Sequence, residues 1–585
     1  SISFPTETQK SLWLLLPHFL SFFLSPTRRR DMAGVPGAND VIGSSKNGIS
    51  DHENSGSGHS KDVNSISSVS DTEGTEEVLE DDQQSDLRTL AELICFEEVP
   101  PKRFENIDYA PLGEFSPLFK PSFNEIETEC MEVFEKKKME TKKILGNFDG
   151  QISLSVEILR CESYFEPSCC GDYLCLSAHF IDENWELNDW VLHFCSISVS
   201  GPSDDSLNKY EDWGILRSLE DWGIENKISA LTVKNDNCNN ELVEFLQTHI
   251  QGKMELQLNG KLFCVYCCGE MISVMVQDAF DKIEDIVHKV RLVYTFKTDY
   301  PMWFLKLLNL QEALKLWSQG NVSYRDVTHS HNVPSPEEWK KVEGVCKIVN
   351  SVYEVTIRAF FNTTPLTPNV HLCRLLELRK ILAKMSIDSD SFNRTVVEDM
   401  LKKFDKYWDD MFLLLAISTA LDPRLKMRYI EFVCSEVKDW NGNSQVAVVL
   451  GAIHKLFDEY VVRFPLQYNQ QFIHLNGHPK EKSDLDCYLE QPVLPHSQGF
   501  NALAWWRTAS AKYPTLSRMA RDFLAIPVSL ATLSEACYTA GNDRMLTGAF
   551  FYFCCSSLAY GCLTFGRLWN QNSKAIDLGI KTSYF

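Results

Sequence analysis

The sequence predicts an α/β core followed by a large all-α region. Three observations predict this fold class. Apolar and polar residues alternate as in strands between residues 152 and 233, helical apolar spacing dominates residues 303–465, and a Ser-, Gly- and Asp-rich stretch precedes both. With 585 residues, of which 44% are hydrophobic, the chain is long enough for about two to four structural units with a sizeable core.

Residues 1–111 are expected to be a disordered, low-complexity region. Residues 33–90 are rich in small polar residues and end in an acidic run, so they bury too little apolar surface to offset their ordering entropy. The apolar run Leu12–Leu24 is too short to span a bilayer, and three arginines follow it. We expect residues 1–31 to be translated upstream sequence and Met32 to be the natural start.

Residues 112–300 are expected to form the first part of the α/β core. A helix is predicted over 123–145, and further helices over 239–250 and 271–293. Four strands are predicted, over 152–158, 173–181, 190–197 and 227–233. Three strands in succession, followed by strands that alternate with helices, favour a ribonuclease-H-like core.

Residues 301–480 are expected to be a helical insertion. Pro336-Glu-Glu-Trp339 is a good helix start, because acidic residues in a first turn suit the helix dipole. Helices are predicted over 396–407 and 410–421, where the pattern stops at Asp422-Pro423. Two more are predicted over 429–437 and 446–464.

Residues 481–541 contain a paired Trp505–Trp506 and then an amphipathic helix. Its apolar stripe follows i, i+3, i+4, i+7, i+8 spacing and consists of Leu516, Met519, Ala520, Phe523 and Leu524. Such a stripe packs either on the core of its own domain or against a partner chain, and the spacing alone leaves both readings open.

Several runs together resemble the hAT-superfamily transposases, and specifically the plant transposase-derived proteins called sleepers. They are YLCLSAHFIDENW, KISALTV, EEWKKVEGVCKIVNSVYEVT, KKFDKYWDD and LLLAISTALDPRLKMRYIEF, followed by the block Tyr488–Ser529. The resemblance implies a ribonuclease-H-like core with a helical insertion, in a nuclear, DNA-binding protein. It also implies that residues 481–541 are a dimerisation segment, pairing with a second copy or with a related hAT protein. We expect its interface or interface-supporting residues to be Trp505, Trp506, Leu516, Met519 and Phe523.

The resemblance further implies three acidic positions for DNA strand transfer. Carboxylates at these positions would hold two divalent metal ions. Glu157 occupies the first and Glu535 the third, but Lys234 stands at the second, where an ammonium offers no lone pair to a metal. Two neighbouring motifs also differ from those of the family. Glu270 stands where the family has a His, and Met302 stands where it has an Arg. We therefore expect no catalytic site, no metal and no cofactor, and regard these acids as vestigial.

Composition limits the partners. Acidic residues exceed basic ones by 80 to 57, which argues against a chain that grips DNA over its whole surface. No BED-type zinc finger is visible, and Cys264-Val-Tyr-Cys267 lacks the second pair that a zinc site needs. We expect neither a small-molecule substrate nor a membrane anchor, although the uncharged run Met545–Gly566 is long enough to span a bilayer.

The leading hypothesis is a catalytically inactive, dimerising, DNA-associated nuclear regulator. The alternatives are an interaction module that pairs with full-length relatives without binding DNA, and a residual metal-dependent nuclease that uses Glu157, Asp236 and Glu535. Beyond Gly541 the resemblance fades, so we expect residues 542–585 to be a divergent tail, and a frameshift or retained intron is our hypothesis for it.

Overall fold

The structure is a computed structural model, which describes residues 83–92, 119–161, 171–197, 214–235, 237–294, 303–320, 333–360, 367–388, 390–436, 442–465, 482–497 and 499–530. The chain divides into two compact units, Ser1–Lys136 and Lys137–Phe585. Each unit is described by itself.

In the first unit, residues 83–92 form a helix. This corrects the expectation that all of residues 1–111 are disordered. Leu90 and Ala91 are fully buried, and Arg88 donates a hydrogen bond from Nη1 to Oε1 of Glu129, over 2.9 Å. Glu129 lies on helix α4 (Phe123–Asn147), so the contact that orders this helix comes from a distant part of the sequence. The acidic composition of the stretch therefore could not predict this helix.

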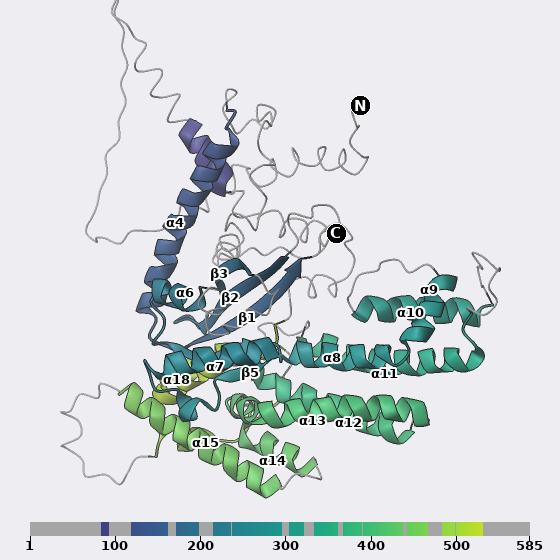
Figure 1. Cartoon of the computed structure of the whole chain (residues 1–585). Helices are drawn as coiled ribbons and strands as arrows, with labels where there is room; N and C mark the ends of the chain where they lie inside the picture. The colour runs from purple at the N-terminus through teal and green to yellow at the C-terminus, as the bar shows by residue number, and fades with distance from the viewer. Residues whose placement is uncertain are drawn as a thin grey trace, which may run out of the picture. The chain divides into compact units, whose positions relative to one another are not determined.

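The second unit is built on one five-stranded sheet (Figure 1). Its strands are β1 (Ile152–Cys161), β2 (Gly171–Ile181), β3 (Leu187–Ile197), β4 (Ile228–Val233) and β5 (Cys264–Tyr266). The strand order is β3-β2-β1-β4-β5, with β1, β2 and β3 antiparallel and β1, β4 and β5 parallel. This arrangement confirms the predicted ribonuclease-H-like core.

Helices make up most of the rest of this unit. Between β3 and β5 the chain forms α6 (Ile215–Trp222), α7 (Asn237–Gln251) and the 3-10 turn η4 (Gln257–Gly260). After β5 come α8 (Cys268–Asp281) and α9 (Glu284–Val293). The helical region contains α10 (Trp303–Ser318), α11 (Pro336–Phe360), η6 (Pro368–Val370), α12 (His371–Asp388), α13 (Ser391–Ala420), α14 (Lys426–Glu436) and α15 (Gly442–Arg463). Helix α9 packs against α10 and α11 of this region. The C-terminal segment adds α16 (Asp484–Glu490), α17 (Ala502–Ala509) and α18 (Pro514–Leu524).

Three elements differ from the sequence prediction. The helices predicted over 396–407 and 410–421 are one continuous helix, α13, because Trp408 and Asp409 between them are helical and Trp408 is buried like Tyr407. The helix predicted over 271–293 is two helices, α8 and α9. Strand β5 was missed, since three residues inside a CxxC motif carry no strand pattern.

The two faces of the sheet are different. Leu154 and Val156 of β1 pack with Leu246 of α7 in a closed apolar cluster on one face. Side chains of a strand alternate between faces, so Ser155 and Glu157 point to the opposite face. That face adjoins the large helical core, which includes Ala230 of β4. The polar residues of β1 are thus directed toward the helical region.

Among the described residues, no helix is both long and apolar enough to cross a membrane. The run Met545–Gly566 lies outside the described residues.

Candidate functional site

The first two predicted acid positions lie at neighbouring strand ends. Strands β1 and β4 run parallel, and Ser155 is paired with Thr232. Two residues further along each strand, Glu157 and Lys234 come opposite one another on the same face of the sheet. The fold therefore brings these two positions together. Glu535 and Asp236 lie outside the described residues.

The pair at this edge carries opposite charges. Nζ of Lys234 lies 3.9 Å from Oε1 of Glu157. The two side chains are 31% and 17% exposed, so water screens this ion pair less than one on the open surface. The sequence prediction gave the residue types but not their pairing.

The start of the segment that leads to Glu535 is attached to the same edge. Thr232 donates its hydroxyl to the carbonyl of Pro527 over 2.6 Å, and Cys268 N–H donates to the carbonyl of Val528 over 2.8 Å. The backbone N–H of Leu530 donates to Sγ of Cys267 at 3.1 Å. The chain thus passes across the carboxyl ends of β4 and β5 just before residue 531.

The described donors at this edge do not suit a divalent metal ion. A hard ion such as Mg²⁺ needs several oxygen ligands. The edge offers the carboxylate of Glu157, the ammonium of Lys234 and the thiol of Cys267. Burial raises the pKa of Cys267, which keeps it protonated. No group of three or more His, Cys, Asp or Glu residues able to hold a metal occurs in the part of the chain that the structure describes.

Helix α18 lies between the sheet and the helical region and is buried on nearly every side. Its apolar stripe is in the large core, while Asp522 on its polar side is only 4% exposed. Asp522 accepts hydrogen bonds from the N–H of Gln151 at 3.0 Å and from the hydroxyl of Tyr460 at 2.6 Å. One carboxyl therefore joins α18 to the start of β1 and to α15. Burial raises the pKa of Asp522 to about 6.

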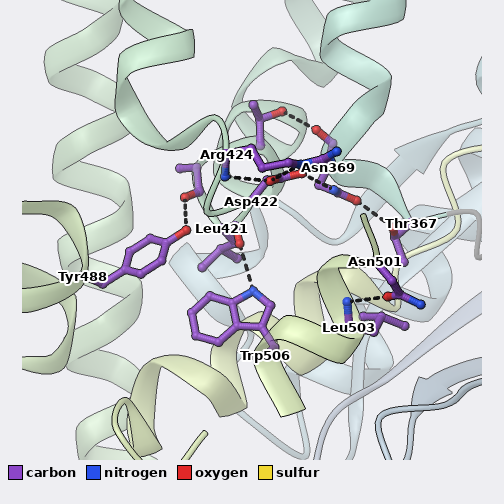
Figure 2. Close-up of polar contacts among 11 residues, drawn as sticks. Thr367, Asn369, Leu421, Asp422, Arg424, Tyr488, Asn501, Leu503 and Trp506 are labelled. Carbon is purple, nitrogen blue, oxygen red and sulfur yellow. Dashed lines mark hydrogen bonds and ion pairs between the residues drawn. The ribbon is translucent and has the colours of Figure 1, made fainter. Parts of the chain in front are cut away.

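An aromatic cluster attaches the C-terminal segment to the end of α13 (Figure 2). Trp506 is fully buried and donates its indole N–H to the carbonyl of Leu421 over 2.9 Å. Tyr488 donates its hydroxyl to the carbonyl of Ala420 over 3.1 Å, and its ring lies 5.4 Å from that of Trp506. The last carbonyls of α13 have no partner within the helix, so these side chains satisfy groups that burial would otherwise leave unpaired.

The turn after α13 is held by a buried carboxylate. Asp422 is fully buried and accepts hydrogen bonds from Nη2 of Arg424 and from Nδ2 of Asn369, both at 2.6 Å (Figure 2). Arg424 stacks over the ring of Phe500, 4.4 Å from its centre. Charge-assisted hydrogen bonds of this kind fix the turn in one conformation.

Lys426 connects the same turn to helix α16. Its φ is 49°, in the left-handed region that costs a side-chain-bearing residue about 1–3 kcal/mol. Its ammonium donates to the carbonyls of Tyr488 and Gln491, the latter at 2.8 Å, at the C-terminal end of α16. A cation is favoured there by the helix dipole. Burial lowers the pKa of Lys426 to about 8.

The structure limits how the predicted dimerisation residues can act. Trp506, Leu516, Met519 and Phe523 are each at most 1% exposed, and Trp505 is partly buried. Side chains buried in their own chain cannot form a direct contact with a partner. For the four buried residues only the interface-supporting role remains as a prediction.

The sequence prediction of the site missed Tyr488, Asp422 and Lys426, although all three lie in runs that carry the family resemblance. Their spacing shows neither helical nor strand periodicity. Tyr488 and Lys426 donate to backbone carbonyls, which any residue type offers, and Asp422 is bound by Asn369, which lies far away in the sequence.

Comparison with known proteins agrees with this geometry. A family model described as the hAT family C-terminal dimerisation region matches residues 484–547. The model of a hAT-like transposase with an RNase-H fold matches residues 369–460, which form α12 to α15, and the ZBED1 RNase-like domain matches residues 169–262. Three hAT-related models thus match separate parts of the chain.

The relatives found among known proteins point the same way. Zinc finger BED domain-containing protein RICESLEEPER 2 of Oryza sativa subsp. japonica is 27% identical, over 80% of this chain and 72% of its own length. The plant sleeper proteins are homologues of this chain. DAYSLEEPER of Arabidopsis thaliana is 25% identical over 70% of this chain and 63% of its own length. The putative AC transposase of Zea mays is 24% identical over 83% of this chain and 64% of its own length.

Proposed function

We propose that this sleeper homologue is a dimerising, DNA-associated nuclear protein that no longer catalyses strand transfer. The observation that carries the proposal is the ion pair between Lys234 and Glu157. In a metal-dependent transposase both positions would offer carboxylate oxygens to a metal ion. An ammonium 3.9 Å from the remaining carboxylate contributes a positive charge and no ligand.

Dimerisation is supported by the matched C-terminal region and by the way it is anchored. Trp506, Tyr488 and Lys426 hold this region on the helical core through backbone carbonyls. We propose that these contacts present its exposed residues to a second copy or to a related hAT protein. The domain limits 112–300, 301–480 and 481–541 remain predictions.

Light scattering coupled to chromatography tests the dimer. We expect the full chain to elute with twice the mass of one 66.9 kDa chain, and the dimer fraction to fall on dilution. A chain that stays monomeric at high concentration would contradict the dimerisation part of the proposal.

Association with DNA is tested by binding to duplex DNA at several salt concentrations. Phosphate contacts make the affinity fall steeply as salt rises. If binding is absent even at low salt while the dimer persists, the chain is an interaction module that pairs with relatives without contacting DNA. Nuclear location is tested by imaging the tagged full chain.

A further inference from the structure

We propose that Lys234 is a built-in counter-cation for Glu157, which makes this edge of the sheet stable without a metal ion. The inference rests on the proposed loss of strand transfer and goes further. It assigns Lys234 a stabilising role, in addition to the absence of a metal ligand at this position. The described donors do not fit a divalent ion, and the ammonium explains how the remaining acid is accommodated.

The position of the pair follows from the backbone. Thr232 and Ser155 are paired in the parallel ladder of β1 and β4, so residue 234 follows β4 at the level of Glu157. Neither residue has to adopt an unusual backbone conformation to bring the charges within 3.9 Å. The sheet itself therefore sets the distance.

The environment of Glu157 strengthens its attraction to a nearby positive charge. Glu157 is 17% exposed, and its Oε1 is buried from water. A partly buried carboxylate without a nearby positive charge destabilises the fold when it is ionised. A metal ion would supply that charge in an active enzyme, and Lys234 supplies it here. The same ammonium repels a divalent cation that approaches Glu157.

The surface offers a matched comparison. Lys142 pairs with Asp221 at 3.1 Å, but both side chains are close to half exposed, at 46% and 47%. Water and salt screen such a pair, and its contribution to stability is small. Lys138 also contacts Asp221, at 2.9 Å, so this carboxylate keeps a positive neighbour when Lys142 is replaced.

The experiment uses the full chain and compares Lys234→Arg, Lys234→Met and Lys234→Asp with the wild type. The probe is Mn²⁺, followed by electron paramagnetic resonance, and the second readout is the melting temperature with EDTA or with excess Mn²⁺. The control is Lys142→Asp. None of these readouts depends on DNA cleavage.

We expect the wild type and Lys234→Arg to melt at the same temperature with EDTA as with Mn²⁺. Lys234→Met should melt about 2–4 °C lower in EDTA, because it removes the positive charge 3.9 Å from Oε1 of Glu157. Lys234→Asp should bind Mn²⁺ at least about tenfold more tightly than the wild type and regain stability when the ion is added. Lys142→Asp should neither bind Mn²⁺ more tightly than the wild type nor become more stable when the ion is added.

Two results would overturn the inference. One is tight Mn²⁺ binding by the wild type that Glu157→Gln abolishes, since the metal would then still occupy this edge. The other is an unchanged melting temperature for Lys234→Met in EDTA. This measurement can be made even if Lys234→Asp does not fold. Metal binding by the wild type without DNA cleavage would refute this inference and leave the proposed function intact.

Discussion

Replacing Trp506 by Ala should detach the C-terminal segment from the helical core. The Trp506 side chain is fully buried, its ring lies 5.0 Å from Trp505 and 5.4 Å from Tyr488, and its N–H satisfies the carbonyl of Leu421. The substitution removes the ring contacts and the hydrogen bond together.

The expected cost can be worked out in two parts. Truncating a buried Trp to Ala typically costs about 3–5 kcal/mol of unfolding free energy. Trp506→Phe keeps much of the apolar volume and loses the N–H donor, so it should cost about 1–3 kcal/mol, because the buried carbonyl of Leu421 is left unpaired. Trp505→Ala is the matched control. Its side chain is only partly buried and no hydrogen bond from its indole N–H is among those described, so it should cost less than Trp506→Ala.

The assay is urea unfolding followed by far-ultraviolet circular dichroism, with light scattering on the same samples. The unfolding midpoint should fall in the order wild type, Trp506→Phe, Trp506→Ala, and the dimer fraction of Trp506→Ala should fall with it. The reasoning is refuted if Trp506→Ala unfolds within about 0.5 kcal/mol of the wild type, the range usual for surface substitutions.

Three further predictions test two buried polar contacts and one turn glycine. Burial raises the pKa of Asp522 to about 6, so its folded carboxyl keeps a proton that the unfolded chain releases near pH 4, and its stabilising effect is lost as pH rises between these values. Denaturant unfolding at pH 4 and pH 7 should therefore show the stability of the wild type relative to Asp522→Asn falling by up to about 3 kcal/mol, whereas a pH-independent difference would contradict this. Lys426→Met should lower the free energy of unfolding in urea by at least about 1 kcal/mol, because it leaves the carbonyls at the end of α16 unpaired, and an unchanged free energy would count against this contact. Gly260→Ala should lower the melting temperature, since φ is 79° and the added Cβ would lie 2.5 Å from Nε2 of Gln247; a variant as stable as the wild type would show that the turn adapts.

The sequence predicted the ribonuclease-H-like core because its strands are long enough to show alternation. It could not predict β5, which has three residues and is defined by pairing with β4. It also divided α13 in two between residues 407 and 410, where Trp408 is buried in the helical core and the helix continues. In both cases contacts distant in sequence decide the local structure.

For the candidate site too, the sequence predicted some features and only the structure shows the others. The residue types at 157 and 234 predicted that Lys234 replaces one acid while Glu157 keeps the other, but the distance between the two side chains depends on the register of β1 and β4. The apolar stripe of α18 was evident from spacing. The spacing did not show whether the stripe faces a partner or the chain's own core, because helical periodicity indicates which residues are buried and not what covers them. The structure places the stripe in the chain's own core.

The most direct test of the account is DNA cleavage by the purified full chain. Supercoiled plasmid is incubated with the wild type and with Glu157→Gln, in Mg²⁺ or Mn²⁺, and the relaxed product is measured on a gel. We expect the wild type to produce no more relaxed plasmid than Glu157→Gln, because the ammonium of Lys234 beside Glu157 offers a metal ion no ligand. Metal-dependent relaxation by the wild type that Glu157→Gln abolishes would contradict it and would support a residual nuclease.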